Sequence, residues 1–430
     1  MARQRLAGTF RAAIAGLLLV VGPGALAGTQ AWVGADIWLG KEQGYLEDAV
    51  LLVQDGRVAD VFARSERSVP DGTTIHVVDG EFIIPGLINA HGHVGMARGL
   101  ETGAEIHSRD NVIDQLRLYA AYGITTVVSL GDEPAEAFDV RDTMDPAAPD
   151  MARLFVAGEV PNPATADEAR EAVDRLRAMD PDWLKIRVDD QLGQTEAMPR
   201  EAYGAFIEEA HVHDEDVATH MVTLDHAKGL LEEGTDLIAH SVRDAPVDQE
   251  LIDLMLDRDV CITPTLTREV STYVYADRPD FFDDPFFKRH ADPTVLEQLQ
   301  EPEVQQRYTG EAADYYREAL PLALDNMMIL HEAGVRIAMG TDSGPPARFQ
   351  GYFEHLEMAM MQNAGMSPAD ILESATRVAA DCMGIGDELG SLEPGNWADF
   401  VILPEDPSAD IRHLRVLQTV VLAGRVFSNP

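Results

Sequence analysis

The chain has 430 residues, of which 46% are hydrophobic and 25% charged, values that are ordinary for a globular protein. Its 74 acidic residues outweigh 33 lysines and arginines, which gives a formal net charge of −41. Such an acidic surface repels polyanions, so we exclude nucleic acid and anionic membranes as partners. The length suits one barrel of about 250–300 residues plus a smaller domain.

The first 27 residues have the pattern of a secretory signal peptide. Arg3, Arg5 and Arg11 precede the apolar run AAIAGLLLVV, and ALAG at Ala25–Gly28 resembles a small-residue cleavage site. The apolar run is shorter than the roughly 18 residues that a membrane span needs. We therefore expect export to the periplasm or the medium, with no membrane attachment once the signal is removed. An uncleaved N-terminal anchor is the alternative.

Both ends of the remaining chain have β-strand character. Residues 28–84 contain the strand-like runs AWVGADIWL, AVLLVQDGRVADVFA and TTIHVVDGEFII, and no helix of any length intervenes. Residues 389–430 continue in the same way, with NWADFVIL and VLQTVVLAGRVFS. We predict that the two ends combine in one small β-sandwich domain.

Strand-like and helix-like segments alternate through residues 85–388, which predicts an α/β fold of the (β/α)8 TIM-barrel type. The expected strands are 83–89, 125–130, 153–158, 183–188, 217–222, 237–242, 260–266 and 336–342. The helical segments include 165–179, 199–213, 246–258 and 367–383. About 70 residues separate the last two strands, and such a long connection is expected to be a lid or specificity element, or else a surface excursion that contacts a second copy.

Candidate metal ligands lie at the carboxyl ends of these strands, where barrel enzymes place their chemistry. His91 and His93 follow the first strand, and side chains at i and i+2 of a strand project to the same face. Imidazole suits zinc and its first-row neighbours, although two histidines in a loop are also common. His220, His240 and Asp342 lie at the ends of three further strands. Together these residues suggest a metal site.

Lys185 lies in the strand-like segment WLKIRV, and the chain has few other lysines. An amine of lowered pKa can react as a neutral nucleophile, whereas a guanidinium stays protonated. A lysine in a chain that otherwise prefers arginine therefore suggests that arginine would not serve there. The alternative is an ordinary lysine whose stem lies along apolar surface at a strand end.

This order of residues resembles the amidohydrolase superfamily, which has HxH after the first barrel strand, Lys after the fourth, His after the fifth and sixth, and Asp after the eighth. The segments LEPGNWADFVIL and DGRVADV also resemble parts of that family's second domain. The resemblance covers nearly the whole chain. It implies two divalent metal ions, expected to be zinc, bridged by an N6-carboxylated Lys185.

By the same resemblance, one ion is held by His91, His93, Lys185 and Asp342, and the other by Lys185, His220 and His240. A hydroxide that bridges the ions would attack a scissile carbonyl. Asp342 would serve as the catalytic general base and then deliver the proton to the leaving nitrogen.

The branch that the chain most resembles has imidazolonepropionase-like and prolidase-like members. We therefore expect an exported hydrolase that cleaves a C–N amide bond in a small-molecule substrate, a dipeptide or an N-acyl amino acid. A mononuclear deaminase, a lactonase or phosphotriesterase, and a barrel that binds without catalysis remain alternatives. Mononuclear members of the superfamily generally lack the lysine of the fourth strand, so Lys185 argues against a mononuclear deaminase.

Four residues are candidates for binding a substrate carboxylate or lining the pocket. Arg187 lies two residues beyond the candidate lysine on the same strand face, where a bidentate contact is possible or an ion pair with a nearby acid. Arg243 is a similar candidate. Tyr273 and Tyr275 would line the pocket or donate to an oxyanion, with simple packing as the alternative. Arg348 is a weaker candidate.

Cys261 and Cys382 are the two cysteines, and we expect both to be buried free thiols. The histidines outside strand ends are expected at the surface or in packing: His107, His211, His213, His226, His290, His331, His355 and His413. A homo-oligomer is compatible with the sequence, which does not specify the oligomeric state.

Overall fold

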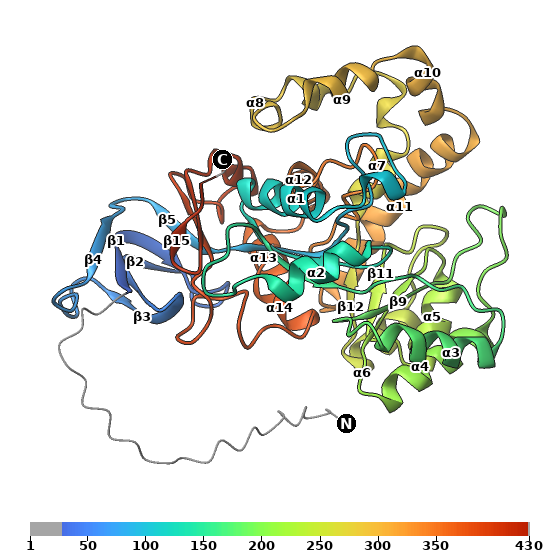
Figure 1. Cartoon of the computed structure of the whole chain (residues 1–430), viewed down its shortest axis with the longest axis horizontal. Helices are drawn as coiled ribbons and strands as arrows, with labels where there is room; N and C mark the ends of the chain where they lie inside the picture. The colour runs from blue at the N-terminus through green and yellow to red at the C-terminus, as the bar shows by residue number, and fades with distance from the viewer. Residues whose placement is uncertain (1–27, 429–430) are drawn as a thin grey trace.

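A computed structural model describes residues 28–428 (Figure 1). The expected signal peptide, residues 1–27, lies outside the described residues. Within 28–428, none of the helices combines the length and apolar character required to cross a membrane.

The two ends of the chain meet in one mixed eight-stranded sheet. Its strands lie in the order β15 (Arg425–Val426), β14 (Thr419–Leu422), β13 (Phe400–Leu403), β5 (Phe82–Pro85), β1 (Thr29–Trp38), β2 (Tyr45–Gln54) and β3 (Arg57–Ala63), and β4 (Thr74–Val77) pairs with β1. β13 runs antiparallel to β5, so the C-terminal strands add directly to the N-terminal ones. The sequence predicted a sandwich of two layers, and that second layer is not confirmed.

Short parallel strands form the centre of the molecule. One sheet contains β6 (Leu87–Gly92), β7 (Ile124–Ser129) and β8 (Arg153–Val156), and the other contains β9 (Leu184–Arg187), β10 (Val217–His220), β11 (Leu237–Ala239) and β12 (Cys261–Thr263). Parallel bridges from Gly92 to Ser343 and from Ile262 to Ile337 place segment 337–343 between β6 and β12. Nearly every residue in these strands is buried, as expected for parallel strands covered by helices.

Helices follow the strands along the chain: α1 (Arg109–Ala121), α2 (Ala135–Thr143), α3 (Ala166–Arg177), α4 (Arg200–Val212), α5 (Leu224–Glu233), α6 (Gln249–Arg258), α12 (Tyr352–Ala364), α13 (Pro368–Ser374) and α14 (Arg377–Cys382). Side-chain caps begin several of them, since Thr165, Thr223 and Asp248 each accept a backbone N–H three residues on. The single helix expected at 367–383 is two helices, because Thr376 leaves helical geometry (φ −132°, ψ −99°).

The long connection after β12 is mainly helical. It contains α7 (Leu266–Ser271), α8 (Pro285–Lys288), α9 (Pro293–Gln298), α10 (Pro302–Gln305) and α11 (Glu311–Glu332). In Figure 1, α8 to α10 form an arm that projects from the body of the molecule, while α7 and α11 lie against that body. The arm is fixed by an aromatic cluster in which Phe281, Phe282 and Phe287 pack against Tyr275 and Tyr352.

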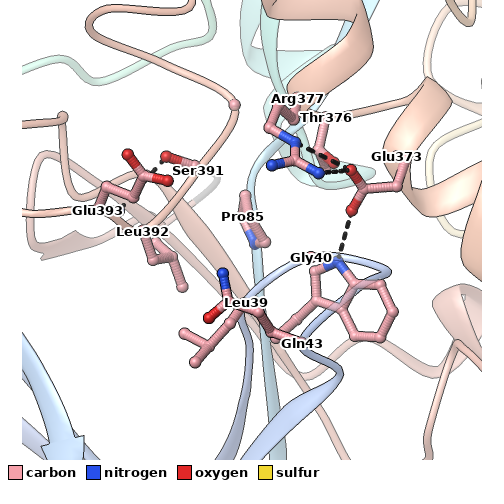
Figure 2. Close-up of a pocket in the computed structure, with 12 residues that line it drawn as sticks. Leu39, Gly40, Gln43, Pro85, Glu373, Thr376, Arg377, Ser391, Leu392 and Glu393 are labelled. Atoms are coloured by element: carbon pink, nitrogen blue, oxygen red, sulfur yellow. Dashed lines mark hydrogen bonds and ion pairs between the residues drawn. The ribbon is translucent and has the colours of Figure 1, made fainter.

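A buried carboxylate joins the terminal sheet to the helices, at a small cavity of about 70 Å³ (Figure 2). Glu373 of α13 accepts hydrogen bonds from the indole N–H of Trp38 at 3.2 Å and from the backbone N–H of Lys41 at 3.0 Å. The guanidinium of Arg377 also donates to it, at 2.7 and 3.0 Å. Contacts from residues 38–41 and from Arg377 to this one carboxylate therefore fix the sheet against α13 and α14.

Cys261 and Cys382 form a disulfide between β12 and α14, so the prediction of two free thiols is wrong. The residues are 121 positions apart, and only the folded chain brings them together. A cross-link that closes a loop of this size restricts the unfolded chain and stabilises the fold by up to about 5 kcal/mol.

Candidate metal centre

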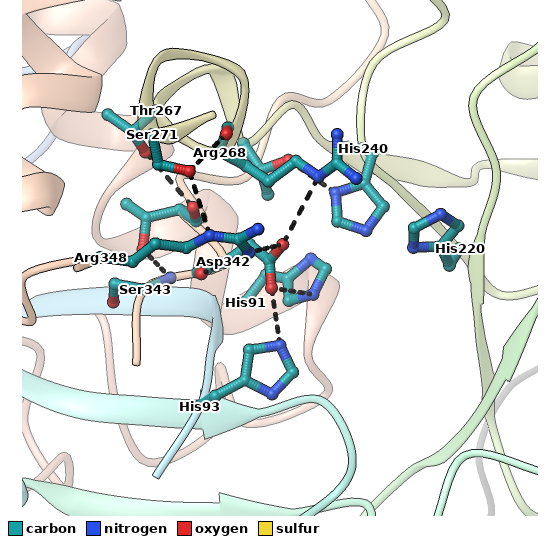
Figure 3. A network of polar contacts seen from close by, with 12 residues as sticks. His91, His93, His220, His240, Thr267, Arg268, Ser271, Asp342, Ser343 and Arg348 are labelled. Carbon is teal, nitrogen blue, oxygen red and sulfur yellow. Dashed lines mark hydrogen bonds and ion pairs between the residues drawn. The ribbon is translucent and has the colours of Figure 1, made fainter. Parts of the chain in front are cut away.

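A cavity of about 350 Å³ lies at the carboxyl ends of the parallel strands. All of the predicted ligands line it: His91, His93, Lys185, His220, His240 and Asp342. Figure 3 shows the imidazoles and the carboxylate of Asp342 facing a common space. The strands therefore bring together side chains that are far apart in sequence.

His91, His93 and Asp342 form the tightest part of this cluster. The Nε2 atom of His93 lies 2.7 Å from Oδ1 of Asp342, and Nε2 of His91 lies 3.9 Å from the same oxygen. The backbone explains this proximity, because the N–H of Asp342 donates to the carbonyl of His91 at 2.7 Å. Their ligand atoms all lie within 4.8 Å of one another, a spacing that suits a shared metal ion.

His240 and His220 continue the cluster across the cavity. The ring centroids of His91 and His240 are 4.8 Å apart, and those of His240 and His220 are 4.2 Å apart. His240 has a left-handed backbone (φ 76°) immediately after β11. This conformation is uncommon for a residue other than glycine, and it often marks a functional position.

Each imidazole is held from outside the cluster of candidate ligands through one ring nitrogen. Nδ1 of His93 lies 2.8 Å from the carbonyl of Gly131, and Nδ1 of His240 lies 2.7 Å from Oγ1 of Thr265. Nδ1 of His91 makes a longer contact, 3.3 Å, with Oγ1 of Thr263. His220 is held through the other nitrogen, since its Nε2 lies 3.2 Å from Oδ2 of Asp189.

The amine of Lys185 is buried, and its nitrogen has no hydrogen-bond partner among the described residues. Burial, opposed by Asp342 and assisted by the nearby Arg187, lowers the pKa of Lys185 to about 7. A buried, unpartnered ammonium is unfavourable. The site therefore favours a neutral amine.

Burial sets the protonation of the other groups. It lowers the pKa of His220 to about 3, and it holds the pKa of His91 and His240 well below the usual range. Burial alone would raise the pKa of Asp342, but Arg348 and His93 hold it well below its usual value. Neutral imidazoles and an ionised carboxylate are the forms that bind metal ions.

Two arginines that the sequence analysis ranked low or missed lie next to Asp342. Nη1 of Arg348 donates to Oδ2 of Asp342 at 2.5 Å. Nε of Arg268 lies 3.9 Å from the same oxygen, and its Nη2 donates to the hydroxyl of Tyr316 at 3.3 Å. Arg268 and Tyr316 come from the long connection and line the cavity. The position of Arg268 just beyond the seventh strand was the signal that could have identified it.

Of the four expected substrate-binding residues, Arg187 alone lines the cavity. Arg243 is buried in an ion pair with Glu269. Tyr275 is fully buried and donates to the carbonyl of Ala347, and Tyr273 packs under the guanidinium of Arg317. The structure therefore corrects the prediction for Arg243, Tyr273 and Tyr275, whose side chains are engaged in packing or ion pairing and do not line the cavity.

The donor set fits a divalent metal centre. Four imidazoles, one carboxylate and one unpartnered amine converge, and imidazole and carboxylate are the ligands that zinc and related ions take outside thiolate sites. A second grouping, Asp174, Glu209 and His213, is more exposed and lies on outer helices. We therefore place the candidate metal centre in the cavity.

The family model described as "Amidohydrolase family" matches residues 82–427. The chain belongs to the amidohydrolase family. This confirms the resemblance drawn from the sequence, and the match includes each of the candidate ligands. With its fold and its relatives, the family makes this protein a hydrolase that acts on carbon–nitrogen bonds.

Three relatives illustrate the likeness. Uncharacterized protein Rv2915c of Mycobacterium tuberculosis is 25% identical over 388 residues, which cover 88% of this chain and 91% of that protein. Imidazolonepropionase of Pseudomonas putida is 36% identical over 114 residues, or 25% of this chain and 27% of the enzyme. The crystal structure of a putative prolidase from Bifidobacterium longum superposes with a TM-score of 0.74 at 25% identity, covering 93% of this chain and 95% of that one.

Proposed function

We propose that this amidohydrolase cleaves a C–N amide bond in a dipeptide or an N-acyl amino acid, with two divalent metal ions, expected to be zinc. The observation that carries the proposal is the convergence of four imidazoles, Asp342 and the unpartnered amine of Lys185 at one end of the strands. When bound, the ions supply Lewis-acid activation of water and of the scissile carbonyl.

The proposal assigns the ligands to two groups. His91, His93 and Asp342 would hold one ion, and His220 and His240 the other. Lys185 would join the two groups as an N6-carboxylated side chain. A neutral amine is the form that adds to carbon dioxide, and burial without a hydrogen-bond partner supports that form here.

Asp342 is proposed to transfer a proton from the attacking water to the leaving nitrogen. An ionised carboxylate oxygen of Asp342 accepts the proton of the attacking water and then passes it to the leaving nitrogen. The leaving amine requires this proton because an amide anion is a very poor leaving group. Arg348 stays beside Oδ2 of Asp342 and keeps the carboxylate oriented toward the cavity.

Arg187 is proposed to bind a carboxylate of the substrate. It lines the cavity beside the ligand cluster, and its Nε atom is buried with no hydrogen-bond partner in residues 28–428. A guanidinium can bind a carboxylate through two parallel hydrogen bonds. This contact would select peptides or acyl amino acids with a free carboxyl group.

Two further expectations belong to this proposal. The parallel strands would close as a (β/α)8 barrel, supported by the bridges on both sides of segment 337–343 and by the hydrogen bond from Asp182 N to Val156 O. The protein would be exported to the periplasm or the medium. The Cys261–Cys382 disulfide supports export, because disulfides persist mainly in oxidising compartments.

The test is a panel of dipeptides and N-acyl amino acids, with an ester and a lactone beside them, assayed with zinc-loaded protein. Wild type should hydrolyse the amides best, and Lys185→Ala should lose almost all turnover. The control is Lys288→Ala, because Lys288 is exposed and pairs with Asp283. Preferred hydrolysis of the lactone, or full activity in Lys185→Ala, would contradict the proposal.

A further inference from the structure

We propose that Asp189 is a positioning residue that fixes which ring nitrogen of His220 faces the candidate metal centre. The inference rests on the proposed metal centre for its functional meaning. Its structural part, the tautomer of His220, stands on the contacts of the chain itself.

The backbone holds Asp189 and His220 side by side. The N–H of Val188, the residue after β9, donates to the carbonyl of His220 at 2.8 Å, which extends the β9–β10 pairing by one step. Asp189 follows directly and is 9% exposed, and His220 is 7% exposed. Their side chains meet with Oδ2 of Asp189 3.2 Å from Nε2 of His220.

The carboxylate of Asp189 is itself fixed. Its Oδ1 atom accepts the backbone N–H of Gln191 at 3.1 Å. That leaves Oδ2 directed at His220. The sequence left open an ion pair between Arg187 and a nearby acid, but no ion pair between Arg187 and Asp189 is present in residues 28–428.

The chemistry of the Asp189–His220 pair determines which ring nitrogen of His220 carries the hydrogen. An ionised carboxylate only accepts hydrogen bonds, so Nε2 of His220 must carry the hydrogen. A neutral imidazole has one N–H, and Nδ1 of His220 is therefore left with a free lone pair. A metal ion binds that lone pair, and a carboxylate on the opposite nitrogen makes it more basic.

The other three imidazoles are contacted at the opposite ring nitrogen, Nδ1. The carbonyl of Gly131 can only accept, so Nδ1 of His93 carries a hydrogen, and Nε2 is the nitrogen that faces Oδ1 of Asp342 in the candidate metal centre. His91 and His240 are likewise contacted at Nδ1, by Thr263 and Thr265. Asp189 therefore holds His220 at the ring nitrogen opposite to the one contacted in the other three imidazoles, and it does so with a carboxylate in place of a carbonyl or hydroxyl.

The first experiment reads the tautomer in metal-free protein. Long-range proton–nitrogen NMR of ring-labelled histidine identifies His220 by the signal that is lost in His220→Asn. In wild type, Nε2 of His220 should carry the hydrogen. In Asp189→Leu, that preference should be lost. Asp189→Asn should retain it, because the amide oxygen can still accept from Nε2.

The second experiment measures zinc binding by titration calorimetry. Asp189→Leu should weaken one of two binding events by about 10–100-fold, the usual effect of removing a group that orients a metal ligand. The zinc affinity of Asp189→Asn should lie between those of Asp189→Leu and wild type. The matched control is Asp190→Asn, because Asp190 is adjacent and exposed, and it should bind zinc as wild type does.

The outcomes separate this inference from the proposed function. Hydrogen on Nδ1 of His220 in wild type, or an unchanged tautomer and unchanged zinc affinity in a folded Asp189→Leu, would overturn the role of Asp189. Absence of amide hydrolysis with a normal His220 tautomer would overturn the proposed function and leave the structural role of Asp189 in place. Far-UV circular dichroism and the thermal midpoint establish that each variant is folded.

Discussion

Asp342 meets His93 on one side and Arg348 on the other, with its two oxygens divided between them. Oδ1 lies 2.7 Å from Nε2 of His93, and Oδ2 lies 2.5 Å from Nη1 of Arg348. The oxygen that faces the imidazoles is the one placed for a metal ion. The arginine fixes the other oxygen, so that the carboxylate has one orientation at the point where a proton must be moved.

Asp342→Asn should lower kcat by at least about 100-fold, because an amide cannot accept the proton that the proposed mechanism requires. The free energy of unfolding should change much less, since asparagine has nearly the same shape. Steady-state kinetics on the best amide substrate measure the effect. A variant with near-normal kcat would remove Asp342 from proton transfer.

Arg187→Gln should raise KM for a substrate with a free carboxylate by about tenfold or more, because a charge-assisted hydrogen bond is lost. The carboxamide analogue of the same substrate should be cleaved equally by wild type and variant. Arg175→Gln is the control, since Arg175 is an exposed residue of α3 that pairs with Glu159. Equal losses on the charged and the neutral substrate would argue against carboxylate recognition.

Glu354→Ala should destabilise the protein by about 2–4 kcal/mol. One oxygen of Glu354 accepts from Asn89 Nδ2 at 2.6 Å, Thr341 Oγ1 at 2.7 Å and Ser343 Oγ at 2.6 Å. These donors lie beside the ligands of the cavity, and the variant would leave them buried and unpaired. Denaturant unfolding measures the change, with the exposed Glu332→Ala as control. A loss no larger than in the control would contradict this account.

His355→Gln should reduce the acid sensitivity of the fold. Burial lowers the pKa of His355 to about 3, although its hydrogen bond to the carbonyl of Tyr122 opposes the shift. The unfolded chain, with the ordinary pKa of 6.5, binds a proton as pH falls below 6.5, and the folded chain does not. Wild type therefore loses up to about 1.4 kcal/mol per pH unit between pH 6.5 and 3 from this group.

The thermal midpoint of His355→Gln, measured from pH 7 to pH 4, should fall less than that of wild type. Above pH 6.5 the histidine is neutral in both states, so the two profiles should run parallel there. Parallel profiles over the whole range would show that His355 does not contribute to acid sensitivity.

Added sodium chloride should raise the thermal midpoint. The net charge of −41 makes the folded chain repel itself, and salt screens that repulsion over a Debye length of about 10 Å at 0.1 M. Differential scanning calorimetry from 0.05 to 1 M salt measures the trend. A midpoint that falls with salt would show that surface ion pairs outweigh the excess of carboxylates.

Strand periodicity was enough to predict that His91 and His93 face the same side. Positions in or after strand-like segments, together with the family resemblance, predicted that Lys185, His220, His240 and Asp342 join them around one cavity. It succeeded because the histidines lie at or just beyond strand ends and Lys185 lies within β9, where the backbone fixes the side-chain direction.

Residues beyond the strand ends were harder to predict. Arg243 lies in an irregular segment after β11, and Tyr275 lies in the one-turn 3-10 helix Val274–Ala276, so no periodicity indicates which side chain faces the cavity. Arg268 lies on α7, a helix too short to show a pattern. The pairing of Cys261 with Cys382 depends on where α14 packs, which is a property of the assembled fold.

The most direct test of the central claim is the number of metal ions per chain in protein purified with zinc and bicarbonate, measured by mass spectrometry of the metal. The account predicts two ions per chain in wild type and fewer in Lys185→Ala, with Lys288→Ala unchanged. Two ions per chain in a folded Lys185→Ala, or at most one in wild type, would contradict a centre in which Lys185 joins two metal ions.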